Sequence, residues 1–452
     1  MELYLQILFY LCLFFPVLHI FHCLPWFSVQ GENEKRNPIT EKGISILVPC
    51  YNEAGIIETS VNSMQSFPYK NFEVIYVNDG STDETFPLLK EYLNLEPCWK
   101  KPLNNLPHEE VESIYQSKLQ PNIYVVNKVN GGKADALNAG IEYSTKELII
   151  TLDADTVLTE TALTAVNDKF DDENVVAAGG MVHVLQTKTK KALSKLSLSG
   201  ANFLVRAQML DFLKAFYVTK ISLARFQGLA IISGAFGIFK KNLLIEVGGY
   251  RSSVGEDIDI TLKIQRYISK KKNRKKKVIL ITDAISYTEL PENWKDLFKQ
   301  RIRWQKAYVD CLFHFFPFLL KTLFTRSVSF FYIVESLFVA ILAGYMTIGI
   351  FIYSATVNFS LSLVSFVFLY LLYIVLFNLL YDILAIMQIK RYGFTFEKKN
   401  GFRLFLTIIY DVSVHRFITM YFVLYGSIAY FFNRDWKKVA RTGRNYGTDI
   451  AS

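Results

Sequence analysis

The feature that most constrains this chain is a run of 46 residues, Ser336 to Tyr381, without one charged side chain. About 20 apolar residues cross the hydrocarbon core of a bilayer. The run is therefore too long for one crossing and fits two, with a turn between residues 354 and 360. We expect two transmembrane helices within residues 326–388.

Two further stretches suit a membrane. Residues 3–29 carry no Asp, Glu, Lys or Arg, and no small-residue cleavage site follows them, so residues 1–29 are predicted to be a retained anchor rather than a signal peptide. A polar linker follows over residues 31–42. Residues 402–432 are apolar but are interrupted by three ionisable residues: Asp411, His415 and Arg416.

The flanks of that last stretch conflict. The loop at 390–403 and the tail at 433–452 are both basic, and basic flanks favour the cytoplasm, yet one crossing cannot place both there. We interpret 402–432 as a transmembrane or re-entrant segment and 433–452 as a cytoplasmic tail. The three ionisable residues within 402–432 could line a polar path or could pair that segment with other helices, and both interpretations stay open.

Charge and cysteine content exclude some classes. The 452 residues carry a net charge of +9, but seven positive charges lie in the run Lys270–Lys277. A basic loop beside an anionic membrane surface explains that run, and a nucleic-acid partner is not predicted. The five cysteines form no metal-ligand spacing with one another or with the six histidines, so neither a zinc site nor a disulfide framework is expected.

From Ile44 onward, short apolar runs alternate with helical segments. This alternation predicts an α/β domain over residues 44–290 with a parallel, doubly wound sheet. Residues 96–121, rich in proline, are predicted to be a surface insertion, and 231–239 a strand or tight loop. The predicted strands are residues 44–48, 72–77, 122–127, 148–152 and 278–282.

Acidic side chains follow several of these strands. Asp153 and Asp155 end the strand 148–152, where the carboxyl edge of such a sheet binds ligands. Carboxylates there suit Mg²⁺ or Mn²⁺ with a diphosphate completing the shell. Asp-x-Asp is common by chance, and two solvated residues in a surface turn are the alternative interpretation.

The other acids strengthen the ligand interpretation. Asp79 follows the strand 72–77, and Glu256 and Asp257 lie in a later loop. Transfer of a sugar from a nucleotide needs carboxylates for the nucleoside, for a divalent ion and for the proton of the attacking hydroxyl. Lys133, behind two glycines at a predicted helix start, adds a positive charge for phosphates. Together these residues indicate glycosyl transfer.

Two segments suit the membrane surface. Residues 191–226 show apolar residues at helical spacing among basic ones, which predicts interfacial helices, with a buried helical hairpin as the alternative. Residues 291–325 form a second such segment, with an amphipathic helix expected over 294–321. This second segment contains the sequence QRIRW at 300–304.

Six motifs in order give the chain a family resemblance. They are PCYNE (49–53), VNDGSTD (77–83), NGGKADALNAG (130–140), TLDADT (151–156), GED (255–257) and QRIRW (300–304). With them the chain resembles the processive, membrane-embedded family 2 glycosyltransferases of GT-A fold. Within that family it is most similar to the bacterial poly-β-1,6-N-acetylglucosamine synthases, which are related to hyaluronan and cellulose synthases.

The resemblance implies roles for the residues of the first five motifs. Tyr51 and Glu53 would bind substrate, Asp79 the uracil or ribose, and Lys133 the diphosphate region. Asp153 would hold the nucleotide and share the metal with Asp155. Asp257 would be the general base, with Glu256 beside it as part of the catalytic pair.

The last motif would bind the acceptor and the diphosphate. Gln300, Arg303 and Trp304 would do so from an interfacial helix, since a Trp ring suits a sugar and an Arg suits a phosphate. Membrane anchoring is the alternative role for Trp304.

The resemblance also implies an activity and partners. It implies inverting transfer, with Mg²⁺ or Mn²⁺, from a UDP-sugar, most closely UDP-N-acetylglucosamine, to a growing exopolysaccharide of the biofilm type. The protein would be a multi-pass plasma-membrane enzyme with its catalytic domain in the cytoplasm and room for a small accessory membrane subunit. Alternatives are a hyaluronan- or cellulose-type synthase, a non-processive transferase to a lipid, and an export scaffold with a degenerate transferase domain.

The chain departs from the family pattern in places. Gly255 stands where relatives often have Thr, and a single span is expected before the catalytic domain. No C-terminal domain of a cyclic-nucleotide-binding kind is expected, which disfavours the cellulose synthases.

Overall fold

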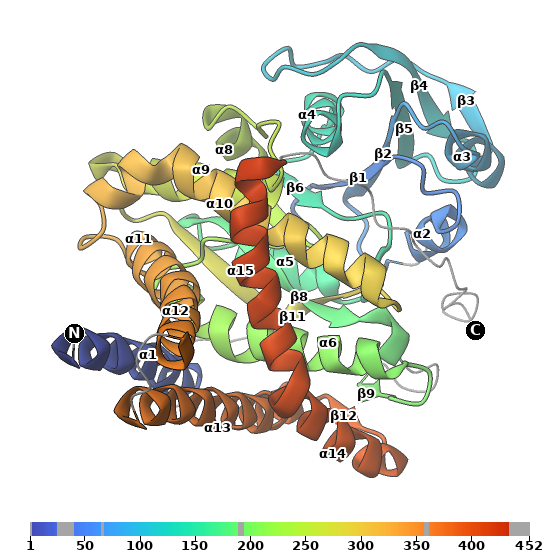
Figure 1. Cartoon of the computed structure of the whole chain (residues 1–452). Helices are drawn as coiled ribbons and strands as arrows, with labels where there is room; N and C mark the ends of the chain where they lie inside the picture. Colours follow the sequence, from blue (N-terminus) through green and yellow to red (C-terminus); the bar gives the residue numbers. More distant parts are fainter. Residues whose placement is uncertain (1, 25–39, 65–66, 189–193, 357–360, 434–452) are drawn as a thin grey trace. The chain divides into compact units, whose positions relative to one another are not determined.

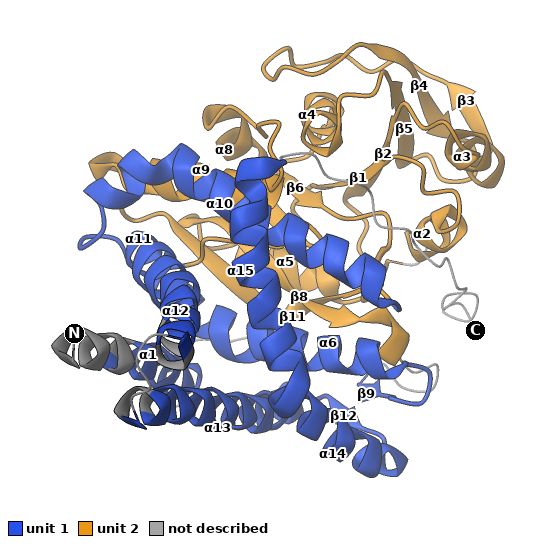
Figure 2. Cartoon of the chain, viewed as in Figure 1, with its two compact units in different colours: residues 1–32, 191–228, 292–438 blue, residues 33–190, 229–291, 439–452 orange. Residues whose placement is uncertain are grey.

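The computed structural model describes residues 2–24, 40–64, 67–188, 194–356 and 361–433. The chain divides into two compact units (Figure 2). Unit 1 comprises residues 1–32, 191–228 and 292–438, and unit 2 comprises 33–190, 229–291 and 439–452.

Unit 2 is built on a sheet of ten strands in the order β3-β4-β5-β2-β1-β6-β10-β8-β11-β7 (Figure 1). In chain order these strands are β1 (Ile44–Cys50), β2 (Phe72–Asp79), β3 (Leu95–Pro97), β4 (Val111–Ser117), β5 (Ile123–Lys128), β6 (Leu148–Thr151), β7 (Thr156–Leu158), β8 (Val175–Val184), β10 (Gly237–Lys240) and β11 (Lys277–Thr288). The helices of unit 2 are α2 (Ile57–Ser63), α3 (Thr85–Leu93), α4 (Lys133–Tyr143), α5 (Ala162–Lys169), α8 (Lys241–Glu246) and α9 (Glu256–Ile268). This architecture confirms the predicted α/β class.

The prediction of a parallel sheet is correct for its centre and wrong for some of the strands around it. Strands β1, β2, β5 and β6 are parallel to their neighbours within that group, as predicted. Strand β10, however, runs antiparallel between β6 and β8. A run of four residues carries too little pattern to fix its direction, because alternation and hydrophobicity look the same in both orientations.

The predicted insertion at 96–121 contains strand structure that the sequence pattern did not indicate. Its two ends form β3 and β4, which extend the edge of the sheet by antiparallel pairing of β4 with β5. The side chain of Glu142 in α4 fastens the stretch between them, because its Oε1 accepts bonds from the amides of Asn105 (2.9 Å) and Leu106 (2.7 Å). The insertion therefore belongs to the sheet domain.

The core of unit 2 lies between the sheet and its helices. Helix α4 packs on β1 and β2 with most of its residues buried. It approaches closely because Gly140 has no side chain: a Cβ there would lie 3.1 Å from the Cδ1 atom of Leu47 in β1. This packing fixes the first residue of α4, Lys133, at the end of the sheet.

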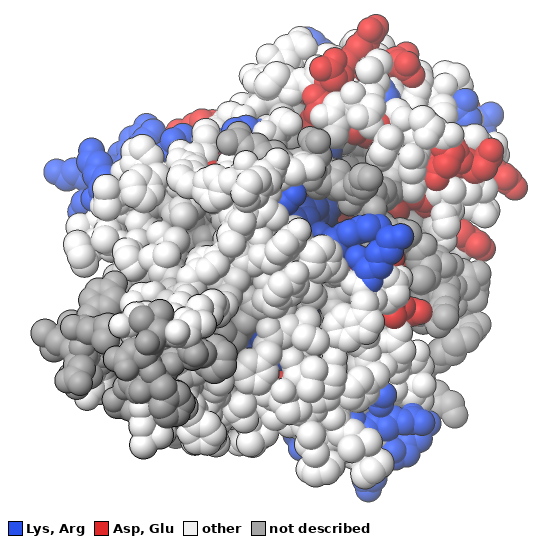
Figure 3. All heavy atoms as spheres, in the orientation of Figure 1, with Lys and Arg blue, Asp and Glu red and all other residues white. Residues whose placement is uncertain are grey.

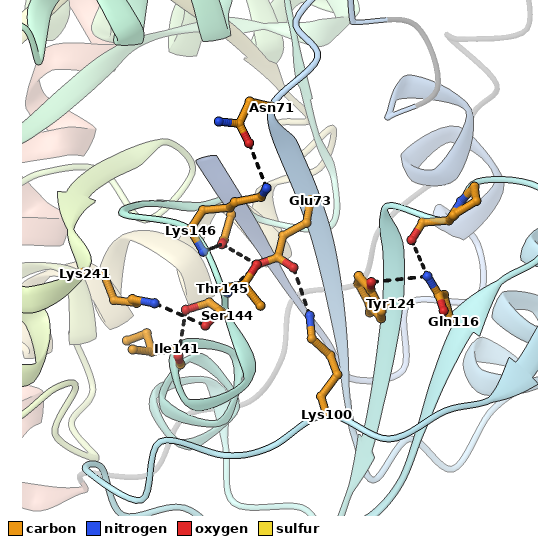
Figure 4. Close-up of polar contacts among 12 residues, drawn as sticks. Asn71, Glu73, Lys100, Gln116, Tyr124, Ile141, Ser144, Thr145, Lys146 and Lys241 are labelled. Atoms are coloured by element: carbon orange, nitrogen blue, oxygen red, sulfur yellow. Dashed lines mark hydrogen bonds and ion pairs between the residues drawn. The ribbon is translucent and has the colours of Figure 1, made fainter. Parts of the chain in front are cut away.

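A buried carboxylate ties the insertion to the start of the central strands (Figure 4). Glu73 of β2 accepts bonds from the Ser45 hydroxyl (2.7 Å) and the Thr145 amide (2.6 Å), and pairs with Lys100 at 2.9 Å. The Lys100 ammonium also lies 3.6 Å from the centre of the Tyr124 ring. Burial opposes ionisation of Glu73, but Lys100 and these bonds lower its pKa below the usual value.

Removal of the Lys100 charge should destabilise the protein. We expect Lys100→Met to lower the free energy of unfolding by about 1–3 kcal/mol, because Glu73 loses its buried charged partner. A carboxyl with a lowered pKa stabilises the fold above its unfolded pKa and loses that contribution as the pH falls through its folded value. The difference between variant and wild type should therefore shrink from pH 7.5 to pH 3.5 in thermal unfolding of the purified full chain.

Lys118→Met is the matched control, because Lys118 lies in the same insertion and pairs with Glu96 at 3.3 Å with both side chains half exposed. An exposed pair should contribute about 0–1 kcal/mol. Equal losses in the two variants would contradict the role of the buried pair.

Unit 1 is helical. Its elements are α1 (Glu2–Cys23), β9 (Lys195–Leu196), α6 (Phe203–Lys214), the π-helix η3 (Ala215–Lys220), α7 (Ile221–Arg225), α10 (Trp294–Lys321), α11 (Ser327–Phe330), the π-helix η5 (Phe331–Leu342), α12 (Ala343–Thr356), α13 (Leu361–Arg391), β12 (Thr395–Phe396), α14 (Gly401–Tyr410), the π-turn η7 (Asp411–His415) and α15 (Arg416–Phe432). Helix α10 has the expected bounds and is capped by Asn293, whose side chain accepts a bond from the Asp296 amide at 3.0 Å.

Three helical stretches among the described residues are long and apolar enough to cross a membrane: Ser327–Gly349, Val367–Arg391 and Lys398–Phe432. In Figure 3, Lys, Arg, Asp and Glu are almost absent from the described surface over α12, α13 and α15. The third stretch is helical throughout and includes the π-helix η7, where Asp411 and His415 are buried. In α1, the shorter segment Cys12–Cys23 is also apolar.

Some expectations fall on residues outside the described ranges. These are the end of the anchor (25–29), most of the linker (31–39), the first residues of the predicted interfacial helices (191–193), part of the turn between the two spans (357–360) and the basic tail (434–452).

Candidate functional site

Lys133 occupies the centre of the candidate site in unit 2. It is the first residue of α4, after Gly132 at φ +90°, a conformation that favours glycine. Its Nζ lies 2.7 Å from Asp153 Oδ1 and 2.7 Å from Glu256 Oε1. Burial opposes the ammonium form, but the two carboxylates raise the pKa of Lys133, so it stays charged.

The two aspartates of the TLDADT motif (151–156) lie between β6 and β7. Asp153 follows β6 and pairs with Lys133, as described above. Asp155 is buried, and its Oδ1 lies 3.3 Å from the hydroxyls of Thr156 and Thr288. Thr288 is the last residue of β11, which pairs with β7. Hydroxyl bonds of that length orient the carboxylate without adding a charge to it.

Glu256 and Asp257 are the first two residues of α9. Glu256 is held by Lys133, whereas Asp257 points toward a different group, with Oδ2 3.4 Å from the Gly234 amide. Negative charges at this position are favoured by the helix dipole. The two adjacent acids therefore have distinct surroundings, one paired with an ammonium and one beside a backbone amide.

Asp79 ends β2 and is only 2% exposed. Its carboxylate pairs with Lys128 at 2.8 Å and accepts bonds from the amides of Gly131 (3.0 Å) and Gly132 (2.8 Å). It thus holds the glycine turn that precedes Lys133. Lys128, which sequence reasoning missed, is fully buried and also pairs with Asp135 at 2.5 Å.

The first motif lies in the turn after β1. Tyr51 is exposed, and the amide of Glu53 donates to the Thr85 hydroxyl at 2.7 Å. Asn52, at φ +54°, accepts a bond from the Thr82 amide at 2.8 Å. The turns after β1 and β2 are therefore bonded to each other at the carboxyl edge of the sheet.

A small pocket contains Lys133, Glu256 and Asp257, and its lining also includes Thr151, Ser233, Gly234, Tyr250 and several apolar side chains. Gly234 leaves room for the lysine, since a Cβ there would lie 3.1 Å from Lys133 Nζ. Burial raises the pKa of Tyr250, so its phenol remains a hydrogen-bond donor. Ser233, Gly234 and Tyr250 were not predicted as site residues, although the small residues at 233–235 were a usable signal.

The sequence profiles of two related families match most of the chain. "Glycosyl transferase family 2" matches residues 45–248, and "Glycosyl transferase family group 2" matches residues 148–433. The chain belongs to the family 2 glycosyltransferases. The two matches overlap on residues 148–248, which include both aspartates of the Asp-x-Asp motif and the Ser233-Gly234 loop of the pocket.

This glycosyltransferase is similar to curated relatives named "Poly-beta-1,6-N-acetyl-D-glucosamine synthase". It is 28% identical to one from Staphylococcus epidermidis and 26% identical to one from Staphylococcus aureus, in each case over 62% of this chain and 58% of the relative. The matched region therefore spans little more than half of their length. These similarities confirm the predicted family.

Among solved structures, the glycosyltransferase is similar to a mannosyltransferase from Pyrobaculum calidifontis in complex with GDP-Man and Mn²⁺. The TM-score is 0.57 at 16% identity, and the match covers 84% of this chain and 96% of that one. At this identity the likeness shows the fold, and it confirms the GT-A class.

The remaining predicted residues lie on α10 in unit 1. Gln300 is buried, and Trp304 is 40% exposed. The Trp304 ring lies 4.4 Å from the guanidinium of Arg301 and 6.5 Å from the ring of Phe212 in α6. Arg303, one turn after Lys299, is partly buried on the same helix.

The glycosyltransferase thus has, within unit 2, the groups that transfer from a nucleotide sugar needs. The Lys133 ammonium lies between the carboxylates of Asp153 and Glu256, a third carboxylate, Asp155, lies two residues after Asp153, and a fourth, Asp257, lies beside a backbone amide. Such a set can bind a diphosphate, share a divalent cation and accept a proton.

Proposed function

We propose that this glycosyltransferase extends a β-linked polysaccharide at a membrane, with UDP-N-acetylglucosamine as donor and inversion at the anomeric carbon. The observation that supports this most is Lys133, held at 2.7 Å from both Asp153 and Glu256 with Asp257 next in the chain. That arrangement combines a diphosphate-binding cation with a carboxylate suited to receive a proton. The names of the relatives support the choice of sugar.

Asp257 is the proposed general base. Glu256 is engaged by the Lys133 ammonium at 2.7 Å, whereas Asp257 lies in the same pocket with its Oδ2 3.4 Å from the Gly234 amide. Asp257 would take the proton of the acceptor hydroxyl as that oxygen forms its bond to the anomeric carbon and the diphosphate leaves with its electron pair. Lys133 would give up its contact with Asp153 or Glu256 and would stabilise the negative charge on the departing diphosphate.

Asp153 and Asp155 are the proposed ligands of a divalent cation. Both offer carboxylate oxygens, the donors that Mg²⁺ and Mn²⁺ prefer, and the Thr156 and Thr288 hydroxyls orient the Asp155 carboxylate at 3.3 Å. The ion would neutralise charge on the diphosphate, whose oxygens complete its shell. The residues present therefore fit the group.

Tyr51, Glu53 and Asp79 are proposed to form the nucleoside side of the site. Asp79 would act there chiefly by holding the glycine turn, since its oxygens already bond Lys128 and two amides. Gln300, Arg303 and Trp304 of α10 are the proposed acceptor-binding residues.

We further propose that the protein crosses the membrane several times with its catalytic domain in the cytoplasm. The three apolar helices and α1 support this proposal. The basic loop at 390–403 supports a cytoplasmic position for that segment.

The decisive experiment offers a panel of nucleotide sugars to the purified protein in lipid nanodiscs and measures nucleotide release and product together. UDP-N-acetylglucosamine should be the preferred donor, and the product should be a polymer sensitive to a hexosaminidase of matching linkage. Preference for UDP-glucose, or for alternate addition of two sugars, would indicate a cellulose- or hyaluronan-type synthase. Addition of a single sugar to a lipid would indicate the non-processive alternative, and no nucleotide release with any donor would indicate a scaffold.

Removal of divalent ions should stop transfer. We expect EDTA to lower the rate at least about a hundredfold, because the diphosphate charge would lose the cation that neutralises it, and Mg²⁺ or Mn²⁺ should restore it. Asp155→Asn should raise the Mn²⁺ concentration needed for half-maximal rate, which separates a ligand role from general damage. Transfer that is insensitive to EDTA would contradict the metal proposal.

A further inference from the structure

Six ionisable side chains from four elements of unit 1 meet among its helices. They are Asp211 and Lys214 of α6, Arg301 of α10, Asp382 of α13, and Asp411 and His415 of η7. We call this set the ion network. Asp411 and His415 are the residues that interrupt the apolar stretch at 402–432, and here they find partners up to 204 residues away in the chain.

Lys214 neutralises the deeper part of the ion network. Its ammonium bonds Asp411 Oδ2 and the Asn378 Oδ1 atom (3.0 Å) and lies 3.2 Å from Asp382 Oδ1. Asn378 in turn donates to Asp411 at 2.6 Å. Both aspartates have no exposed surface, so an uncompensated charge there would be costly.

The same arrangement disfavours a metal ion in unit 1. Asp211, Asp411 and His415 have ligand atoms within 4.8 Å of one another, as a metal site requires. The Lys214 ammonium already bonds one of these carboxylates, however, and a second cation beside it would be repelled. We therefore interpret the network as a set of ion pairs.

Asp211 connects this network to the QRIRW segment. Its Oδ2 lies 2.9 Å from His415 Nε2 and 3.6 Å from Arg301 Nη2. The Arg301 guanidinium covers the Trp304 ring at 4.4 Å, and Phe212, the neighbour of Asp211 in α6, packs on the same ring. Two adjacent residues of α6 thus contact both Arg301 and Trp304.

We propose that Asp211 is a positioning residue: by holding Arg301 it fixes the orientation of Trp304, so that the ion network among the apolar helices sets how firmly the growing chain is held. This inference rests on the proposed function of α10 in acceptor binding. Packing of the helices does not by itself require the charges of the ion network, because apolar side chains of similar volume would give a contact that is no less stable. Positioning of Arg301 gives these charges a role.

The test compares Asp211→Asn with Glu335→Gln. Glu335 belongs to another polar contact of unit 1, partly buried, in which His19 Nε2 lies 2.9 Å from Glu335 Oε1 and His19 Nδ1 lies 2.8 Å from Ser222 Oγ. That contact involves no residue of α10, so its loss perturbs helix packing without releasing Arg301. Each variant is assayed in nanodiscs for mean product length, for the KM of an added oligosaccharide acceptor and for the KM of the donor.

Asp211→Asn should raise the acceptor KM about tenfold, because Arg301 loses its carboxylate ion-pair partner at 3.6 Å, and shorten the product, with the donor KM unchanged within about twofold. Asp211→Glu should restore both values because it keeps the charge. Arg301→Lys, a milder change, should shorten the product to a lesser extent because Lys keeps the charge but loses the planar contact with Trp304. Glu335→Gln should leave acceptor KM and product length at wild-type values.

Two results would overturn the inference. One is an unchanged acceptor KM and product length in both Asp211→Asn and Arg301→Lys. The other is an equal change in Glu335→Gln, which would assign the effect to general packing. If the wild-type protein makes no polymer with any donor, both the proposed function and this inference are wrong. If it makes a polymer whose length is the same in wild type and Asp211→Asn, only this inference is wrong.

Discussion

Replacement of Asp257 by Asn is expected to lower the rate of sugar transfer by about 10²–10⁴-fold, the range that a general base contributes. The amide has nearly the shape of the carboxylate but cannot accept the proton of the acceptor hydroxyl. Lys133, Asp153 and Glu256 pair with one another without Asp257, so donor binding should remain close to that of the wild type. Nucleotide release and donor affinity, measured on the same preparation, check both parts.

Two companion variants sharpen this test. Asp172→Asn makes the same chemical change at a half-exposed position of unit 2, where Asp172 pairs with Lys277 at 2.6 Å, and should leave transfer unchanged. Glu256→Gln should affect donor binding more than Asp257→Asn does, since Glu256 is a partner of Lys133. Near-normal transfer by Asp257→Asn with no transfer by Glu256→Gln would move the base role to Glu256.

The second large effect is expected for Lys133→Met. The variant keeps an apolar stem but loses the ammonium between Asp153 and Glu256, and a lost bond between charged groups costs about 1.5–3 kcal/mol. The donor KM should therefore rise at least about tenfold, and the rate should fall as well because the departing diphosphate loses a positive charge.

Lys146→Met provides the matched control for Lys133→Met. Lys146 lies in the same unit and donates to Asn71 at 2.8 Å in the network around Glu73 (Figure 4), away from the residues that line the pocket. Its loss should leave the donor KM unchanged. An unaltered donor KM in Lys133→Met would remove this lysine from the diphosphate site.

The sequence predicted the parallel centre of the sheet well. Strands β1, β2, β5 and β6 are short apolar runs bounded by polar turns, and this pattern indicates buried strands. The bounds of α10 were also predictable, because Asn293 is a strong N-cap and the apolar residues recur at helical spacing.

The contacts of the candidate site were less predictable than its members. Strand β10 runs antiparallel beside β6, and Ser233 and Gly234, which precede β10 in the chain, line the pocket together with Lys133. Strand direction leaves no trace in four residues. Similarly, no pattern in the sequence pairs Asp79 with Lys128, because the partners lie on neighbouring strands 49 residues apart.

The ion network shows the same limit more strongly. The sequence singled out Asp411 and His415 as charges in an apolar stretch, but it left open whether they line a path or pair helices. Their partners Asp211 and Lys214 lie about 200 residues earlier, in a segment whose basic residues suggested a membrane surface. Only the three-dimensional structure joins the two segments.

The place of β10 in the sheet has a consequence for how the protein is made. Strand β10 fills the position between β6 and β8, and it is synthesised only after the helices α6 and α7. A nascent chain that ends before residue 237 has two apolar strands, β6 and β8, each with an unpaired edge in the middle of the future sheet, and such edges favour aggregation. Helices α6 and α7 of unit 1 are therefore synthesised before the sheet of unit 2 can be completed. A fragment that ends at the start of α6 would lack β10, and its sheet would remain incomplete.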